Sequence, residues 1–197
     1  MQIRQPIVAV LGHVDSGKTS LLDRIRGTGV QGREAGGITQ HIGASFLPSD
    51  TIKEMCGPLY KNLEKSEHKV PGILVIDTPG HEVFTNLRSR GGSAADIAIL
   101  VVDVNRGFQP QTNESLKILQ SRKVPFLVAL NKCDQISGWR KSETKFISQA
   151  IKEQDASVQA DLDQKLYDVV GTLSILGYKS EAFYRIQDFK SEIAIVP

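Results

Sequence analysis

Six short apolar runs constrain the fold of this chain more than any other feature of its sequence. Most of them are apolar at successive positions rather than at alternate ones, which is typical of strands buried on both faces of a parallel sheet. These predicted strands cover residues 7–11, 42–47, 73–76, 97–102, 126–130 and 193–196. Since segments with helical spacing separate them, we expect an α/β fold, with a mostly parallel six-stranded sheet covered by helices on both faces.

The spacing of apolar residues predicts helices over residues 19–26 and 112–122, and a mostly helical stretch over 142–178. An apolar stripe within that stretch is expected to pack on the sheet. It consists of Leu162, Leu166, Val169, Leu173 and Leu176. Residues 50–69 are polar, and we expect a short helix and a connection there. Residues 27–38 are rich in glycine and charge, which predicts a long loop of the kind that is often functional.

Composition excludes several classes of protein. There are 24 Lys and Arg against 22 Asp and Glu, so the net charge of +2 argues against a whole-surface nucleic-acid binder. The longest apolar run is far shorter than the ~20 residues that cross a bilayer, and the first residues contain no signal peptide. Two cysteines are too few for a disulfide framework. We therefore expect a cytoplasmic globular domain that binds neither membrane nor DNA directly.

The segment after the first predicted strand fits the phosphate-loop pattern G-x-x-x-x-G-K-[ST]. It consists of Gly12, His13, Val14, Asp15, Ser16, Gly17, Lys18 and Thr19. The glycines allow the backbone N–H groups to point at phosphate oxygens, and the positive end of the following helix adds to the attraction. We expect Lys18 to contact the β- and γ-phosphates and the Thr19 hydroxyl to bind Mg²⁺. A glycine-rich turn is the alternative, which the flanking strand and helix disfavour.

The third predicted strand ends in Asp77, Thr78, Pro79, Gly80 and His81. A carboxylate at the end of a buried strand is costly without a cationic partner, and Mg²⁺ supplies one, directly or through a water. Gly80 allows a close backbone approach, so its N–H can donate to the γ-phosphate. The imidazole of His81 can hold an attacking water in line by hydrogen bonding. The alternative is a simple strand-ending turn, which the preceding phosphate loop disfavours.

The fifth predicted strand ends in Asn131, Lys132, Cys133 and Asp134. The Asp134 carboxylate can accept hydrogen bonds from N1–H and the 2-amino group of guanine. Adenine lacks this pair of donors and would leave the charge unpaired. The Lys132 stem can stack along the base, and Asn131 can bridge the base and the phosphate loop. This short motif gains its specificity from its place at a strand end after two phosphate-binding elements.

The order of these three motifs resembles that of the GTPase superfamily. The sequences Gly-His-Val-Asp and Asp-Thr-Pro-Gly-His are similar to the corresponding motifs of the translational GTPases. The sequence Gly-Ile-Thr-Gln-x-Ile-Gly-Ala over residues 37–44 resembles that of initiation factor two and of its archaeal and eukaryotic counterpart, initiation factor five-B. Residues 3–8 and 88–92 resemble the archaeal and eukaryotic branch. The resemblance covers residues 3–197.

The resemblance implies roles for further positions. The last histidine of Asp-Thr-Pro-Gly-His is the catalytic one in this group, which implies His81. Thr39 is implied to bind Mg²⁺ and to sense the γ-phosphate in the GTP state, so that GTP orders the preceding glycine-rich run and hydrolysis releases it. Asp15 is implied to hold a monovalent cation, K⁺ or Na⁺, beside the phosphates. A plain loop-stabilising carboxylate is an equal alternative for Asp15.

One motif of the resembled family is missing at its usual place. Such domains end with a Ser-Ala motif that contacts guanine, whereas Ser93-Ala94 of this chain precedes Asn131. We expect residues 1–197 to be one GTP-binding domain that stops before that motif, with the later domains of the factor absent. We also expect weaker guanine-nucleotide binding than in a chain extended by about twenty residues.

Motifs and resemblance together imply a GTP-hydrolysing switch domain of a translation initiation factor, which acts in subunit joining and initiator tRNA positioning. The implied ligands are GTP or GDP and Mg²⁺, and the implied partner is the ribosome, with initiator tRNA contacted only through the absent domains. Hydrolysis is expected to depend on placement and charge neutralisation and on stimulation by the ribosome. Arg33, Arg88 and Arg90 are arginine-finger candidates by charge alone. The alternatives are a nucleotide-binding module without turnover, an ATP-dependent kinase, which Asp134 disfavours, and an elongation-factor relative.

Overall fold

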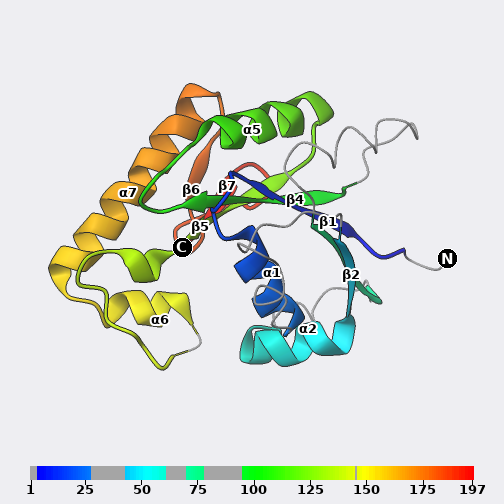
Figure 1. Cartoon of the computed structure of the whole chain (residues 1–197), viewed down its shortest axis with the longest axis horizontal. Helices are drawn as coiled ribbons and strands as arrows, with labels where there is room; N and C mark the ends of the chain where they lie inside the picture. The colour runs from blue at the N-terminus through cyan, green and yellow to red at the C-terminus, as the bar shows by residue number, and fades with distance from the viewer. Residues whose placement is uncertain (1–3, 28–42, 61–69, 78–94, 145) are drawn as a thin grey trace.

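A computed structural model of the 197-residue chain describes residues 4–27, 43–60, 70–77, 95–144 and 146–197. Its centre is a seven-stranded sheet in the order β2-β3-β1-β4-β5-β7-β6 (Figure 1). The strands are β1 (Ile7–Gly12), β2 (Gly43–Pro48), β3 (Gly72–Asp77), β4 (Ile97–Asp103), β5 (Phe126–Asn131), β6 (Ser180–Ala182) and β7 (Ile193–Val196). Strand β2 runs antiparallel to β3 and the other pairs are parallel, which confirms the predicted fold class.

The prediction of six strands was one strand short. The missed strand is β6, a three-residue segment that pairs in parallel with β7 at the edge of the sheet. Its sequence, Ser-Glu-Ala, contains no apolar run. Apolar periodicity in the local sequence therefore does not reveal this strand.

Helices fill the connections between the strands. They are α1 (Lys18–Arg26), α2 (Ser49–Cys56), α5 (Pro110–Arg122), α6 (Ile147–Lys152) and α7 (Ala156–Ile175), with 3₁₀ turns η3 (Gly57–Tyr60) and η5 (Cys133–Gln135). The predicted helical stretch over 142–178 thus contains two helices with a break between them. Most of the predicted loop over 27–38 lies outside the described residues. None of the described helices is long and apolar enough to span a bilayer.

Both faces of the sheet are buried, as the unbroken apolar runs predict. Along β1, Val8 and Val10 pack with Leu22 of α1, while Ala9 and Leu11 face the larger core that contains side chains of α5 and α7. Helices α1 and α2 lie on one side of the sheet, and α5 and α7 on the other (Figure 1). Four members of the predicted α7 stripe are buried in the larger core: Leu162, Leu166, Val169 and Leu173. The fifth, Leu176, follows the helix and is 40% exposed.

The parallel strands bring the ends of β1, β3 and β5, where the three motifs begin, to one edge of the sheet. Gly12, at the end of β1, is paired with Val101 of β4. Asp103, at the end of β4, is paired with Asn131 of β5. The carboxyl ends of adjacent parallel strands are where open α/β sheets bind ligands, so this edge holds the candidate site.

Candidate functional site

The phosphate loop is a tight turn between β1 and α1 that requires glycine at two points. Gly17 has a φ of 90° and precedes α1 directly. A Cβ on Gly17 would lie 2.2 Å from Nδ2 of Asn131, and a Cβ on Gly12 would lie 2.3 Å from the carbonyl oxygen of Val101. Both approaches are too close for any side chain, so the two glycines let the loop lie directly against β4 and β5.

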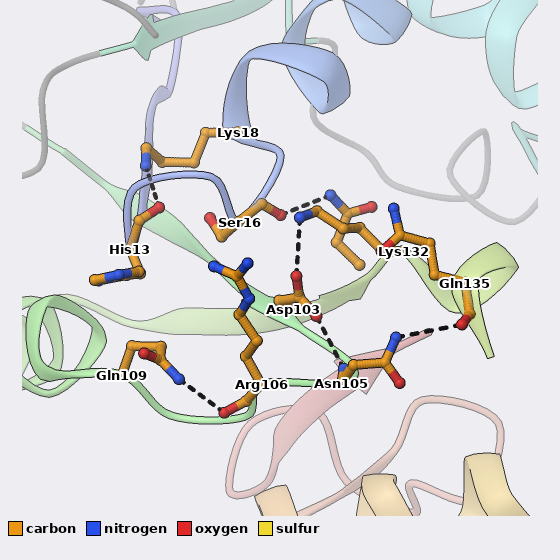
Figure 2. A network of polar contacts seen from close by, with 10 residues as sticks. His13, Ser16, Lys18, Asp103, Asn105, Arg106, Gln109, Lys132 and Gln135 are labelled. Carbon is orange, nitrogen blue, oxygen red and sulfur yellow. Dashed lines mark hydrogen bonds and ion pairs between the residues drawn. The ribbon is translucent and has the colours of Figure 1, made fainter. Parts of the chain in front are cut away.

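The polar groups of this loop are turned toward its interior. The Lys18 ammonium donates to the carbonyl oxygens of Gly12 and His13 at 3.0 and 2.7 Å (Figure 2). Ser16 Oγ and His13 Nδ1 are buried and have no hydrogen-bond partner among the described residues. Buried polar atoms without partners are costly and uncommon in folded proteins, so they distinguish this loop from the rest of the chain. Asp15 is exposed, with a φ of 60°.

Helix α5 supports the phosphate loop through a residue that the motif search missed. The N–H of Val14 donates to Oε1 of Gln111 at 2.9 Å. Gln111 lies in the first turn of α5, far from the motif in sequence. Glutamine at this point gives no signal of its own, because its role depends on how α5 docks on the sheet.

The predicted base-reading segment, residues 131–134, is attached directly to the phosphate loop. Nδ2 of Asn131 donates to the carbonyl oxygen of Ser16 at 2.9 Å, across 115 positions of sequence. The structure therefore brings together the first and third sequence motifs. It shows the contact of Asn131 with the phosphate loop, and the contact with a base stays a prediction.

The Lys132 side chain forms an ion pair with Asp103, which, like Gln111, lies in none of the sequence motifs. Its Nζ lies 2.8 Å from Oδ2 of Asp103, whose Oδ1 accepts the N–H of Asn105 at 2.9 Å (Figure 2). Burial raises the pKa of the Asp103 carboxyl, but the bonds from Lys132 and the backbone outweigh it, so this pKa lies below its ordinary value. Asp103 follows an apolar run directly, the same signal that singled out Asp77.

A cavity of about 580 Å³ adjoins the base-reading segment. Its lining includes Asn131, Lys132 and the exposed Asp134, together with Trp139 and Lys141, which the sequence motifs do not identify. An aromatic ring, a lysine stem and a carboxylate around one cavity suit a flat polar heterocycle. Burial, with the Asp134 charge second, raises the pKa of the neighbouring Cys133 to about 12, so this thiol stays protonated and is no nucleophile.

The remaining predicted site residues are only partly placed. Thr19 is buried in the first turn of α1. Asp77 is the last residue of β3, and its backbone pairs with Val10 of β1. Thr39, Gly80 and His81 lie outside the described residues. So do Arg33, Arg88 and Arg90.

Comparisons with known proteins agree with this architecture. Residues 3–191 match the family described as the Elongation factor Tu GTP binding domain. The chain is 58% identical, over its full length and 33% of the relative, to a probable translation initiation factor IF-2 of Thermococcus sibiricus. It is 54% identical, over 99% of its length and 32% of the relative, to that of Methanopyrus kandleri.

Solved structures are similar as well. The crystal structure of GDP-bound aIF5B from Aeropyrum pernix matches with a TM-score of 0.83 and 54% identity, over 100% of this chain and 33% of that one. The bacterial selenocysteine-specific elongation factor EF-Sec, at 22% identity and a TM-score of 0.55 over 98% of this chain and 26% of that one, shares the fold. The chain thus spans about a third of the length of these initiation-factor relatives.

The family match covers nearly the whole chain, and the initiation-factor relatives are similar from end to end of it. The resemblance inferred from the motifs is therefore confirmed. This chain belongs to the family of the elongation factor Tu GTP-binding domain, the G domain of translational GTPases.

Proposed function

We propose that this chain is the GTP-binding and GTP-hydrolysing switch domain of a translation initiation factor of the two/five-B type. It acts in the cytoplasm on the ribosome, in subunit joining and initiator tRNA positioning. The observation that carries the proposal is the bond of 2.9 Å between the Asn131 amide and the Ser16 carbonyl, because it joins a base-reading segment to a phosphate loop. The names of the relatives, probable translation initiation factors IF-2, support the setting in translation.

The phosphates lie in the loop from Gly12 to Thr19. The support is the tight turn in which Gly17 directly precedes α1 and in which the Lys18 ammonium lies on the carbonyl oxygens of Gly12 and His13. Backbone N–H groups and the helix N-terminus there favour an anion. Lys18 neutralises the β- and γ-phosphates, and the N–H of Gly80 donates to the γ-phosphate.

Thr19, Thr39 and Asp77 would hold Mg²⁺. Hydroxyl and carboxylate oxygens are the ligands this ion prefers, and Thr19 lies next to Lys18 in the first turn of α1. When bound, the ion neutralises charge on the β- and γ-phosphates. Asp15, which is exposed on the loop, would hold a monovalent cation beside the phosphates, and a plain loop-stabilising carboxylate is the equal alternative.

Guanine lies against the cavity beside β5. Asp134 accepts from N1–H and the 2-amino group, and the Lys132 stem covers the face of the base. Direct competition between GTP and ATP for a fluorescent GDP tests this assignment. An ATP-dependent kinase would bind ATP at least as well as GTP, and that result would exclude guanine recognition.

His81 holds the attacking water in line with the γ-phosphate, so chemistry depends on placement and not on a strong base. The chain covers about a third of the length of its relatives. Contacts with initiator tRNA belong to the parts of those relatives that this chain does not cover. The test is release of phosphate from GTP with and without ribosomes. The chain and its His81→Ala variant should bind GTP equally, while only the unaltered chain shows ribosome-stimulated turnover.

Two outcomes of that assay would contradict the proposal. Stimulated turnover that survives in His81→Ala would remove the assigned role of this histidine. Tight GTP binding with no turnover under any condition would identify a binding module whose two nucleotide states act only through changed contacts.

A further inference from the structure

The carboxyl end of β4 holds a buried carboxylate that lies in none of the sequence motifs. The Asp103 side chain is 6% exposed, and its Oδ2 lies 2.8 Å from Nζ of Lys132. Its Oδ1 accepts the N–H of Asn105 at 2.9 Å. Both oxygens are thus engaged, which a buried carboxylate requires.

Lys132 is constrained from both ends of its side chain. Its backbone has a φ of 65°, a left-handed conformation that few residues other than glycine adopt. Its Cε lies 3.8 Å from the point where a Cβ on Gly17 would sit, so the stem runs along the phosphate loop. Asp103 fixes the charged tip. A side chain with four rotatable bonds is thereby held along one path between the phosphate loop and the base-reading segment.

We propose that Asp103 is a positioning residue for the guanine nucleotide, which acts by fixing Lys132 so that its stem lies ready for the face of the base. This rests on the proposed function, since it takes Lys132 to line the base site. Without Asp103, binding must immobilise a free lysine side chain. That cost corresponds to roughly two- to tenfold in affinity.

The same strand provides a matched control at its other end. Asp96 precedes β4, and its carboxylate also accepts from one cation and one backbone N–H, those of Arg4 and Ile7. It lies at the opposite edge of the sheet from the phosphate loop. Asp103→Asn and Asp96→Asn therefore make the same chemical change at the two opposite ends of β4.

The experiment measures GDP and inosine diphosphate (IDP) affinities by calorimetry for the full chain and four variants: Asp103→Asn, Asp96→Asn, Lys132→Met and Asp103→Asn combined with Lys132→Met. Asp103→Asn should weaken GDP about fivefold, and Asp96→Asn should have no effect. In the Lys132→Met background, Asp103→Asn should add nothing. Because Lys132 covers the face of the base and not its edge, the ratio of GDP to IDP affinity should be unchanged by Asp103→Asn.

A readout without nucleotide separates positioning from a general effect on folding. The rate at which acetic anhydride labels Lys132 should rise in Asp103→Asn and stay low in Asp96→Asn. Should Asp103→Asn not fold, Asp103→Glu replaces it. This variant retains the carboxylate and should keep both slow labelling and GDP affinity within about twofold.

Unchanged GDP affinity in Asp103→Asn would overturn the proposal, as would an equal loss with or without the Lys132 side chain. Fast labelling of Lys132 in Asp103→Glu with affinity fully retained would do the same. If the unaltered chain binds no GDP, the proposed function itself fails, while the labelling rates still show whether Asp103 holds Lys132.

Discussion

The two ends of strand β4 use the same side-chain chemistry in opposite ways. At the amino end, Asp96 pairs with Arg4, and their side chains are 38% and 69% exposed. At the carboxyl end, Asp103 and Lys132 are 6% and 22% exposed. An exposed pair contributes little because water and salt screen it, whereas a buried pair is costly to break. Among the described residues, β4 thus has a buried ion pair at its carboxyl end and an exposed one at its amino end.

Backbone conformation at the carboxyl edge shows the same specialisation. Two of the three non-glycine residues with positive φ among those described, Asp15 and Lys132, lie in the loops of this edge, and the third, Lys123, ends α5. Ser16 Oγ and His13 Nδ1 add buried polar atoms without partners. Such features cost stability and concentrate at functional sites. The predictions below compare this edge with other parts of the molecule, from the largest expected effect to the smallest.

The largest effect is expected from Gly17→Ala. The new Cβ would lie 2.2 Å from Asn131 Nδ2, which must push the base-reading segment off the phosphate loop and lower the free energy of unfolding by about 3 kcal/mol. The control is Gly177→Ala, since Gly177 has a similar φ of 84° but open space around it, so strain alone costs about 1 kcal/mol. Urea denaturation of both variants without nucleotide measures the difference, and equal losses would refute the tight contact.

Lys18→Met should weaken GDP about 100-fold, since charge-assisted bonds to phosphate are worth up to ~3 kcal/mol. Lys18 Nζ already lies over the loop, on the carbonyl oxygens of Gly12 and His13. Arg4→Met removes a cation from the amino edge and should leave the affinity unchanged. Calorimetry on both variants tests the contrast, which fails if the two affinities move together.

Asp103→Asn should also lower the free energy of unfolding, by roughly 1.5–2 kcal/mol at pH 7, through loss of the charged partner of Lys132. The folded-state pKa of Asp103 is lowered, so its contribution is present above the unfolded pKa and is lost as the pH falls through the folded pKa. Thermal unfolding between pH 7 and pH 3 should therefore show the two proteins converging in acid. A gap that widens on acidification would contradict this sign.

The smallest effect is expected from Asp96→Asn. The bond from Arg4, followed by that from the backbone N–H of Ile7, lowers the pKa of Asp96, but the pair is exposed. Its removal should shift the midpoint of thermal unfolding by less than about 2 °C. A shift as large as that of Asp103→Asn would remove the contrast between the two ends of β4.

Local sequence predicts most of the sheet because its strands are buried on both faces and are therefore apolar at successive positions. It fails for β6, a three-residue Ser-Glu-Ala edge strand that contains no apolar run and pairs only with β7 among the described strands. It also fails at the break between α6 and α7. There the buried Gln154 side chain donates to the carbonyl oxygens of Arg140 and Ala150 and accepts the Arg140 N–H, a tertiary network that helical spacing does not reveal.

The candidate site divides in the same way. The phosphate loop and the base-reading segment carry residue types whose chemistry is local, so their motifs predict them. Asp103 is predictable from its place directly after an apolar run, by the same reasoning that predicts Asp77. Gln111 and Trp139 could not be predicted, because their places at the site arise from the docking of α5 and from the path of the chain after β5.

Displacement of a fluorescent GDP from the chain by unlabelled GDP and ADP tests the central claim most directly, that this sheet edge is a guanine-nucleotide site. The Asp134 carboxylate and the segment tied to the phosphate loop by Asn131 predict that GDP displaces the probe at concentrations at least about 1,000-fold lower than ADP, as is usual for sites that bond a polar edge. Displacement by both nucleotides at similar concentrations would contradict the claim.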